Sequence, residues 1–267
     1  MRGKDALADS TAPGHDASPA IPSGRVVAQH KPVVPMGCSD CPVRHTTVCR
    51  PHADRNLAAV QRLKMEDRIV RARYKVIDEG VSSDYVYNVL DGWLAVVATA
   101  PSGHRQILDI LMPGAFAGFD MPRPDSPQYG LETLTNASLC VFSKHDFRDA
   151  VRQDMLLLDS LAATLAHQRD RLLIRVDLMG RGGARQRVAF LLLDLFDQAL
   201  TYSPAYVDGT NLYLPLTQND LADACGLTNV RLNHVLRALQ RDGIIDYHGK
   251  MFEFTDRREL EHVAGVR

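Results

Sequence analysis

The spacing of hydrophobic residues changes along this chain, and the changes predict where its elements lie. Residues 1–35 are rich in Ala, Pro, Gly and Ser and show no apolar periodicity, which predicts a disordered tail. Leu57, Val60 and Leu63 then recur at helical spacing, which predicts a short helix over about 53–64.

Short apolar runs separated by turn signals follow. The runs are VYNVL at 86–90, WLAVVAT at 93–99 and QILDILM at 106–112, and each is followed by DG, PSG or PG. Gly, Pro and Asp are the residues that tight turns favour. Short strands with this punctuation are typical of a small antiparallel sandwich or roll, which we place at 53–145.

The pattern becomes helical over 146–179. Five apolar residues form a stripe of coiled-coil type, which predicts the seam of a dimer. These are Leu158, Leu161, Leu165, Leu172 and Val176. A helix packed only on its own domain would show the same stripe, but a second apolar flank (Leu156, Leu157, Leu173) favours a partner helix. Three glycines in MGRGG (179–183) predict that the helix breaks there, so residues 146–182 form a dimerisation helix and hinge.

The clearest pattern lies at 217–245, after an apolar helix predicted at 184–200 and a short strand, LYLPL. Thr217 and Asp220 form a helix start signal of the capping-box kind, and Gly226 suits a tight turn. Thr228 can cap a second helix whose buried stripe is Leu232, Val235, Leu236 and Leu239. Two helices joined by a glycine turn predict a helix-turn-helix, and YHGKMFEFT (247–255) predicts the hairpin wing of a winged helix.

The second helix of this motif is the expected DNA reader. Residues 228–241 carry three Arg and no acidic residue, whereas 184–267 carry nine Lys and Arg against eleven Asp and Glu, a net −2. The positive charge is therefore concentrated on one helix, as phosphate contact requires. The predicted DNA-binding residues are Thr228, Asn229, Val230, Arg231, Asn233, His234, Arg237 and Arg241. A helical hairpin with a solvated face is the alternative.

Composition narrows the class of protein. The formal net charge is −1, so any basic surface must be local. No apolar run is long enough to span a membrane, and the N-terminus has no apolar segment of the secretory kind. We therefore expect a cytoplasmic protein. The chain has no nucleophile elbow, P-loop or dinucleotide fingerprint, so we expect no enzyme.

Three of the five cysteines lie close together in CSDCPVRHTTVC (38–49), within a segment that we place at 36–52. Clustered thiols in a reducing compartment are more often metal ligands or redox groups than disulfides. Structural zinc, a thiol switch and a relic without metal all remain open for them. His45 and His52 are expected to be neighbours of the site or exposed residues, and Cys225 a small buried apolar residue.

Four segments together resemble the Crp/Fnr family of bacterial transcription regulators. They are RYKVIDEG (73–80), VYNVLDGWL (86–94), PGAFAGFD (113–120) and the 217–245 segment, and nearly everything after residue 36 is covered. The resemblance implies an α+β fold: an N-terminal cyclic-nucleotide-binding-like β-roll, a long dimerisation helix, and a C-terminal winged helix-turn-helix at 183–267. It also implies a homodimer on palindromic double-stranded DNA, in contact with RNA polymerase and without a membrane partner.

The cysteines make the chain most similar to the Fnr-like, oxygen-sensing branch. Those sensors hold a [4Fe-4S] cluster through three N-terminal cysteines and one in the roll. Cys38, Cys41 and Cys49 match the first three in order, and Cys140 stands where the family places the fourth. Thiolates are the usual ligands of iron–sulfur clusters. The resemblance therefore implies an oxygen or redox sensor, with a cluster-free regulator or a protein-interaction module as the alternatives.

Three departures from the family's patterns carry further expectations. A cyclic nucleotide site needs a Glu soon after the PG-x-x-x-G turn and an Arg for the phosphate, but Phe119-Asp120-Met121-Pro122 follows Gly118, and Arg123 lies between prolines. We therefore expect no cyclic nucleotide. Val230, Asn233 and His234 stand where readers of the TTGAT-type half-site carry Glu and Ser-Arg, so we expect a different target. Leu172 stands where some oxygen-labile relatives carry an acidic residue on the seam, which is at odds with a simple monomer–dimer switch.

Overall fold

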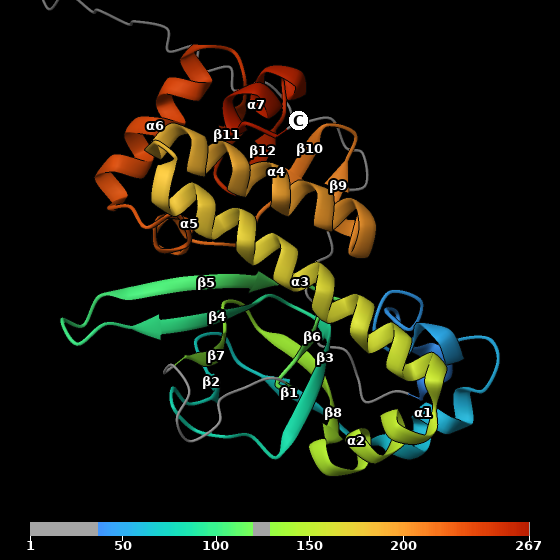
Figure 1. Cartoon of the computed structure of the whole chain (residues 1–267). Coiled ribbons are helices and arrows are strands. Elements are labelled where there is room, and N and C mark those ends of the chain that lie inside the picture. Colours follow the sequence, from blue (N-terminus) through green and yellow to red (C-terminus); the bar gives the residue numbers. More distant parts are fainter. Residues whose placement is uncertain (1–36, 120–128, 267) are drawn as a thin grey trace, which may run out of the picture.

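A computed structural model describes residues 37–119 and 129–266 of the chain (Figure 1). Two predictions fall outside these ranges: the disordered tail at 1–35, and residues 120–123, on which the argument against a cyclic nucleotide site partly depends. The α+β class is confirmed: a β-roll, a long helix and a C-terminal winged helix follow one another in that order. None of the helices described is both long and apolar enough to cross a bilayer.

The β-roll consists of two four-stranded antiparallel sheets, ordered β1-β8-β3-β6 and β2-β7-β4-β5. The strands are β1 (Lys64–Val70), β2 (Lys75–Ile77), β3 (Tyr85–Asp91), β4 (Leu94–Thr99), β5 (Arg105–Leu111), β6 (Phe116–Ala117), β7 (Gly130–Thr133) and β8 (Ala137–Ser143). The three predicted runs are β3, β4 and β5. Strand β1 was not predicted, because most of its residues are polar or only half-buried.

The turn between β3 and β4 carries the chain from one sheet to the other. Gly92 has φ +80°, and a Cβ atom there would lie 2.2 Å from the carbonyl oxygen of Asn136. Only glycine fits so close to another backbone segment. The DG signal therefore marks a crossing between two sheets as well as a turn.

Side chains from both sheets fill the space between them. Tyr87, Val89, Leu139 and Val141 come from the first sheet, and Leu94 and Leu131 from the second. The outer face of the first sheet packs against the cysteine segment and the start of the long helix, while the outer face of the second packs against the C-terminal domain. The cysteine segment contains two short 3-10 turns, η1 (Cys38–Asp40) and η2 (Arg50–His52), and leads into α1 (Leu57–Leu63).

The helix predicted over 146–179 is present, but it is divided in two and extends two residues further at each end; the break predicted in MGRGG follows Arg181. The structure has two helices, α2 (Lys144–Gln153) and α3 (Met155–Arg181). They are separated by Asp154, whose carboxylate accepts hydrogen bonds from the backbone N–H groups of Leu156 and Leu157 and so starts a new helix. Helix α3 also continues through Gly180, since one glycine costs only about 1 kcal/mol and an Asp177–Arg181 ion pair supports the last turn.

The C-terminal domain is the predicted winged helix. Its elements are α4 (Ala184–Tyr202), η3 (Pro204–Tyr206), β9 (Val207–Asp208), β10 (Asn211–Tyr213), α5 (Gln218–Cys225), α6 (Asn229–Arg241), β11 (Asp246–His248), β12 (Met251–Glu253) and α7 (Arg257–Ala264). The capping box at Thr217 and Asp220, the left-handed Gly226 (φ +60°) and the Thr228 cap are all confirmed. Strands β11 and β12 form the expected wing, and Cys225 is buried as predicted.

One apolar core continues from the roll into the C-terminal domain. Trp93, just before β4, and Ile107 and Ile110 of β5 belong to the same buried cluster as the apolar side chains of α4. The rings of Trp93 and Tyr206 meet edge to face, with centroids 5.4 Å apart. Figure 1 shows α5 beside β5, and α3 running from the region of α1 and α2 to the C-terminal domain. The two domains are therefore packed directly on each other as well as joined by α3.

Candidate functional site

The structure brings the cysteine segment onto the sheet that contains Cys140. Cys49 and Cys140 are buried in one apolar cluster, against which Cys41 packs. Cys38 and Cys41 are partly exposed. Cys38 interacts electrostatically with Cys41, Cys49 and Cys140, so all four predicted ligands belong to one neighbourhood.

A row of polar side chains crosses the sheet beneath this segment. Cys140 on β8 pairs with Asp67 on β1 and with Asn88 on β3. Directly paired residues of antiparallel strands project to the same face. The Asp67 carboxylate holds the Lys64 ammonium at 2.6 Å, and the Asn88 amide donates to the Cys49 sulfur at 3.4 Å. The sheet therefore surrounds Cys140 with a charged pair on one side and a hydrogen-bond donor on the other.

Burial makes all four thiols weak acids in the metal-free protein. It raises the pKa of Cys49 to about 11, although hydrogen bonds from Thr47 and Asn88 act in the opposite direction. Burial also raises the pKa of Cys140, and the neighbouring Cys49 raises it further. The pKa values of Cys38 and Cys41 are raised mainly by burial as well. Such thiols become thiolates when a metal displaces their protons.

The donor set has the chemistry of a thiolate metal site. Within residues 37–119 and 129–266, no three His, Cys, Asp or Glu side chains already form a group that could hold one ion. Four cysteine thiolates are a common ligand set for iron–sulfur clusters, in which separate thiolates bind separate iron atoms. They are also a common ligand set for structural zinc.

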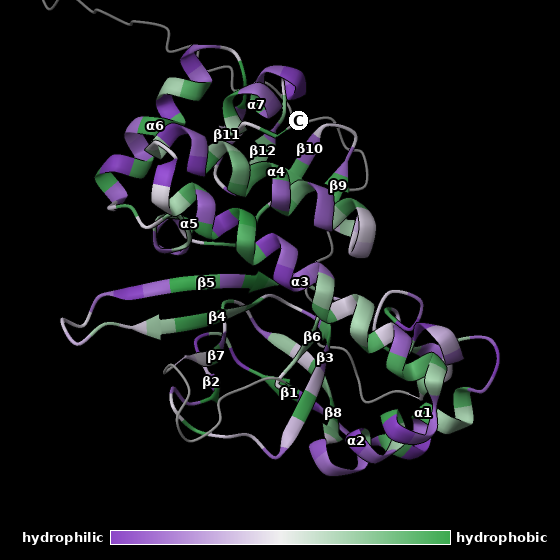
Figure 2. Cartoon of the chain, in the orientation of Figure 1, coloured by the Kyte–Doolittle hydropathy of each residue, from purple (hydrophilic) through white to green (hydrophobic). Residues whose placement is uncertain are grey.

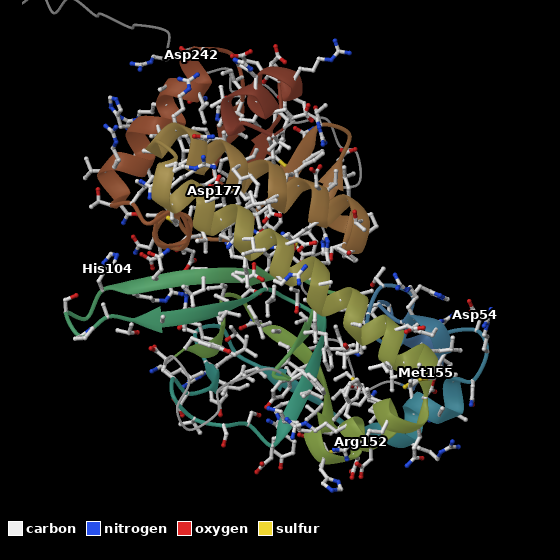
Figure 3. The ribbon with its side chains drawn as sticks, in the orientation of Figure 1. Asp54, His104, Arg152, Met155, Asp177 and Asp242 are labelled. Carbon is white, nitrogen blue, oxygen red and sulfur yellow. The ribbon has the colours of Figure 1, made fainter. Side chains whose placement is uncertain are left out.

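The two histidines of the segment each lie beside a carboxylate. His52 is buried, and its Nε2 atom lies 2.8 Å from Asp154, the residue that starts α3. His45 is exposed and lies 3.6 Å from Asp54, which Figure 3 shows at the outer edge of the segment. His52 therefore connects the cysteine segment to the long helix.

Helix α6 presents a largely exposed polar face, as a DNA-reading helix requires. Its apolar stripe is buried as predicted, with Leu232 and Leu236 each 1% exposed. All the predicted DNA-binding residues but Asn233 are exposed, and Val230 reaches 81%. The exposed residues therefore include all three arginines of this helix, Arg231, Arg237 and Arg241.

Asn233 differs from the rest because its amide already has partners. It donates to the Gln218 side chain and to the Asn229 carbonyl, both at 3.0 Å. The Asn229 side-chain amide also donates a hydrogen bond to the side-chain oxygen of Asn219. The start of α5 therefore lies against the start of α6, and Gln218 and Asn219 join the candidate DNA surface. Sequence reasoning missed them, although two polar residues directly after the Thr217 cap are a usable signal.

The predicted dimer seam on α3 needs one correction. Leu161 is only 3% exposed because it packs in the core of its own chain, so it is not available to a partner helix. One set of exposed positions on α3 instead follows alternating spacings of four and three residues, the signature of a coiled coil, although Leu156, Leu173 and Ile174 are exposed outside it. The positions of this set are Leu158, Ala162, Leu165, Leu172, Val176 and Met179, with Arg169 completing the series and Leu165 half-buried. Figure 2 shows hydrophobic and hydrophilic residues alternating along α3.

A neighbouring, buried face of α3 carries an ion-pair network. Arg171 bonds to Asp109 of β5 at 2.9 Å and to Asp194 of α4 at 3.0 Å, and Arg175 bonds to Asp194 at 3.3 Å. Burial opposes ionisation of Asp194, but the two guanidinium groups outweigh it and lower its pKa. This network joins the roll, the long helix and the C-terminal domain.

A second set of ion pairs joins the roll directly to α5. Arg73 makes two hydrogen bonds of 2.7 Å to the Asp220 carboxylate, and Arg105 bonds to Asp223 at 2.6 Å. Arg73 is the one non-glycine residue with positive φ (63°) among the residues described. Sequence reasoning identified Asp220 only as a cap, because its partners are distant in the chain.

A cavity of about 820 Å³ separates the roll from the exposed face of α3. Its lining is mainly apolar and includes Phe116, Leu131, Leu165, Leu172 and Val176. Residues of the predicted seam, among them Leu165, Leu172 and Val176, therefore border the roll as well as solvent.

Two segments of the chain match known domains. Residues 68–154 match the cyclic nucleotide-binding domain, and residues 186–263 match the Crp-like helix-turn-helix domain. These are the roll and the winged helix described above.

Relatives match over most of their length. The transcriptional activator protein FnrL of Cereibacter sphaeroides is 29% identical over 236 residues, which cover 88% of this chain and 94% of FnrL. The nitrogen fixation regulation protein FixK of Bradyrhizobium diazoefficiens is 25% identical over 229 residues, or 86% and 94% of the two chains. The solved structure of FixK2 from Bradyrhizobium japonicum has the same fold, with a TM-score of 0.63 and 23% identity over 76% of this chain and 98% of FixK2.

Proposed function

The chain belongs to the Crp/Fnr family of DNA-binding transcription regulators, and from this premise we propose that it senses oxygen or redox state through a [4Fe-4S] cluster. We further propose that it acts as a homodimer on a palindromic DNA site, in contact with RNA polymerase. Cys38, Cys41, Cys49 and Cys140 are the proposed cluster ligands.

One observation carries the cluster proposal. Four cysteines, three from the N-terminal segment and one from β8, share one neighbourhood. When bound, the cluster would supply a centre that reacts with dioxygen. The raised pKa values of the same thiols argue against a simple thiol switch, because reactive cysteines have lowered pKa values.

The protein's own residues supply a route from this site to the long helix. The segment that carries Cys49 continues directly into His52, which lies beside Asp154 at the start of α3. Helix α3 is in turn bonded through Arg171 to Asp109 and Asp194, and so to both domains. Release of the cysteine segment from the sheet would therefore remove the His52–Asp154 contact at the N-terminal end of α3, the helix that carries the proposed dimer seam.

The proposed DNA contacts divide along α6. Arg231, Asn233 and His234 lie in its N-terminal half, which faces base edges in helix-turn-helix proteins. Arg237 and Arg241 lie toward its C-terminal end, where phosphate is the expected partner. Val230, which is 81% exposed, places an apolar side chain where TTGAT-type readers carry Glu.

Anaerobic purification with iron and sulfide analysis tests the cluster. We expect about four iron and four sulfide per chain in a brown sample that bleaches in air, as the cluster's composition requires. Cys140→Ala should lose the iron while its circular dichroism spectrum stays that of the wild type. Cys225→Ala is the matched control, since Cys225 is equally buried but lies in the C-terminal domain, and it should keep the iron. A colourless sample with stoichiometric zinc would overturn the proposal.

A further inference from the structure

Asn88 is a polar residue at a position where the fold calls for an apolar one. It lies in the middle of β3 and is 3% exposed. Residues two positions away on a strand point to the same face, and the residues at those positions, Val86 and Leu90, both belong to the apolar cluster beneath the cysteine segment. A buried amide costs free energy unless its groups are hydrogen-bonded. Packing of the sheet therefore does not explain why this residue is Asn.

The contacts of the Asn88 amide point to the thiols. Its Nδ2 group donates to the Sγ atom of Cys49 at 3.4 Å, and its backbone pairs with that of Cys140. Its Oδ1 atom is buried and has no hydrogen-bond partner among the residues described. The side chain is thus placed between one cysteine of the N-terminal segment and the cysteine of the roll, and a sulfur atom is the partner of its N–H group.

We propose that Asn88 is a positioning residue that tunes the iron–sulfur cluster by donating a hydrogen bond to the Cys49 thiolate. This inference rests on the proposed function above. A hydrogen bond to an anion is stronger than one to a neutral group, so the contact strengthens when Cys49 becomes a metal-bound thiolate. It draws negative charge from the sulfur, which stabilises the reduced state of the cluster and raises its reduction potential. Without the donor, the cluster would give up an electron more readily.

Two substitutions remove the donor without introducing a charge. Asn88→Leu and Asn88→Val replace the amide by an apolar side chain that suits the surrounding cluster. Val89→Ala is the matched control, because Val89 is the next residue of β3 and lies in the core on the other face of the sheet. It loosens the same strand without touching the cysteine segment.

The experiment compares the reconstituted, full-length proteins under anaerobic conditions. Substitution of an outer-sphere partner typically changes a metal site's properties by about tenfold or more. For one-electron reduction, a tenfold change in the equilibrium constant is about 59 mV. We expect both Asn88 variants to bind the full complement of iron and to show a reduction potential lower by about this amount, while Val89→Ala matches the wild type.

A spectroscopic readout separates hydrogen bonding from general loosening. The Fe–S(Cys) stretching bands of the wild type should shift on transfer to D₂O, because the amide proton exchanges, and this shift should shrink in the Asn88 variants. Unchanged potential and unchanged isotope shift in iron-loaded Asn88 variants would overturn the inference. So would folded variants that cannot hold iron although Val89→Ala can, since Asn88 would then be needed for assembly rather than tuning. If the wild type binds no iron, the proposed function itself fails first.

Discussion

Substituting Asp220 tests how the roll holds the DNA-binding domain. This carboxylate, 1% exposed at its side chain, accepts two hydrogen bonds from Arg73 and two from Thr217, one from its backbone N–H and one from its hydroxyl. It therefore joins two domains and caps the first helix of the DNA-binding motif at once. Asp220→Ala removes both functions. Asp220→Asn removes the charge pair, but its amide oxygen can still accept from Thr217.

The expected magnitude follows from those contacts. Loss of the two Thr217 hydrogen bonds should cost about 1–2 kcal/mol, since one hydrogen bond contributes a net value of about 1 kcal/mol or less. The contact with Arg73 should contribute about 1–2 kcal/mol, less than a fully buried pair, because the Arg73 side chain is 45% exposed and regains water when its partner is lost. We expect Asp220→Ala to destabilise the protein by about 2–4 kcal/mol and Asp220→Asn by about 1–2 kcal/mol.

The same contact predicts a pH dependence. Burial opposes ionisation of Asp220, but hydrogen bonds from Arg73 and Thr217 outweigh it and lower its pKa. A carboxyl group whose pKa is lowered by folding stabilises the protein above its unfolded pKa of about 3.9, and this stabilisation is lost as the pH falls through the folded pKa. The stability difference between wild type and Asp220→Asn should therefore stay constant from pH 7 to about pH 5 and disappear under more acidic conditions.

Urea unfolding followed by tryptophan fluorescence is the assay. Trp93 is the only tryptophan, and it packs against Tyr206 where the roll meets the C-terminal domain, so its signal reports on this contact. Circular dichroism in parallel shows whether the domains unfold together. A double-mutant cycle with Arg73→Gly isolates the pair, and glycine also relieves the positive φ of Arg73. Equal midpoints for wild type and both Asp220 variants would refute the idea that this contact holds the domains together.

Three further predictions concern the seam, the DNA surface and the buried network. Leu172→Glu, at an exposed seam position, should abolish the dimer by placing two carboxylates face to face, whereas Arg169→Leu should tighten it; sedimentation at micromolar concentration tests both, and a dimeric Leu172→Glu protein would place the seam elsewhere. Arg237→Ala should weaken binding to all DNA sequences about equally, and should reduce the slope of log binding constant against log salt concentration by roughly one unit. Asn233→Ala should instead relax the sequence preference at one base pair of each half-site. Selection from random DNA checks this pair, and recovery of an unaltered TTGAT-type palindrome by the wild type would contradict the assignment of α6. Asp194→Asn should destabilise the protein by about 3 kcal/mol, the lower end for breaking a buried ion pair, since it leaves the buried Arg171 and Arg175 to share the Asp109 carboxylate; a thermal midpoint equal to that of the wild type would disprove this.

The local signals of the sequence were sufficient for the DNA-binding motif. The Thr217–Asp220 capping box, the left-handed Gly226 and the Thr228 cap each depend on residues within a few positions of one another. Their geometry follows from backbone preferences that act over one turn of helix. The strands β3, β4 and β5 were predicted for the same reason, because their apolar runs and turns are adjacent in the chain.

The predicted seam shows where local patterns stop being sufficient. A stripe of leucines on α3 identifies an apolar helix, but two faces of that helix are apolar, and the pattern alone does not say which one packs on the roll. The structure buries Leu161 and leaves Ala162 exposed. The spacing of the leucines placed Leu161 in the predicted seam, whereas its position depends on which side of the helix lies against the cysteine segment.

By itself, the sequence determined the order of the domains, the reading helix and the four cysteines as candidate ligands. Only the tertiary structure decided what surrounds those cysteines and what joins the domains. Asn88 and Cys49 are 39 residues apart, and Arg73 and Asp220 are 147 apart. Hydrogen bonds and ion pairs between such residues depend on side-chain distances of about 3 Å, which strand register and domain packing set together. No pattern with the period of a helix or a strand contains that information.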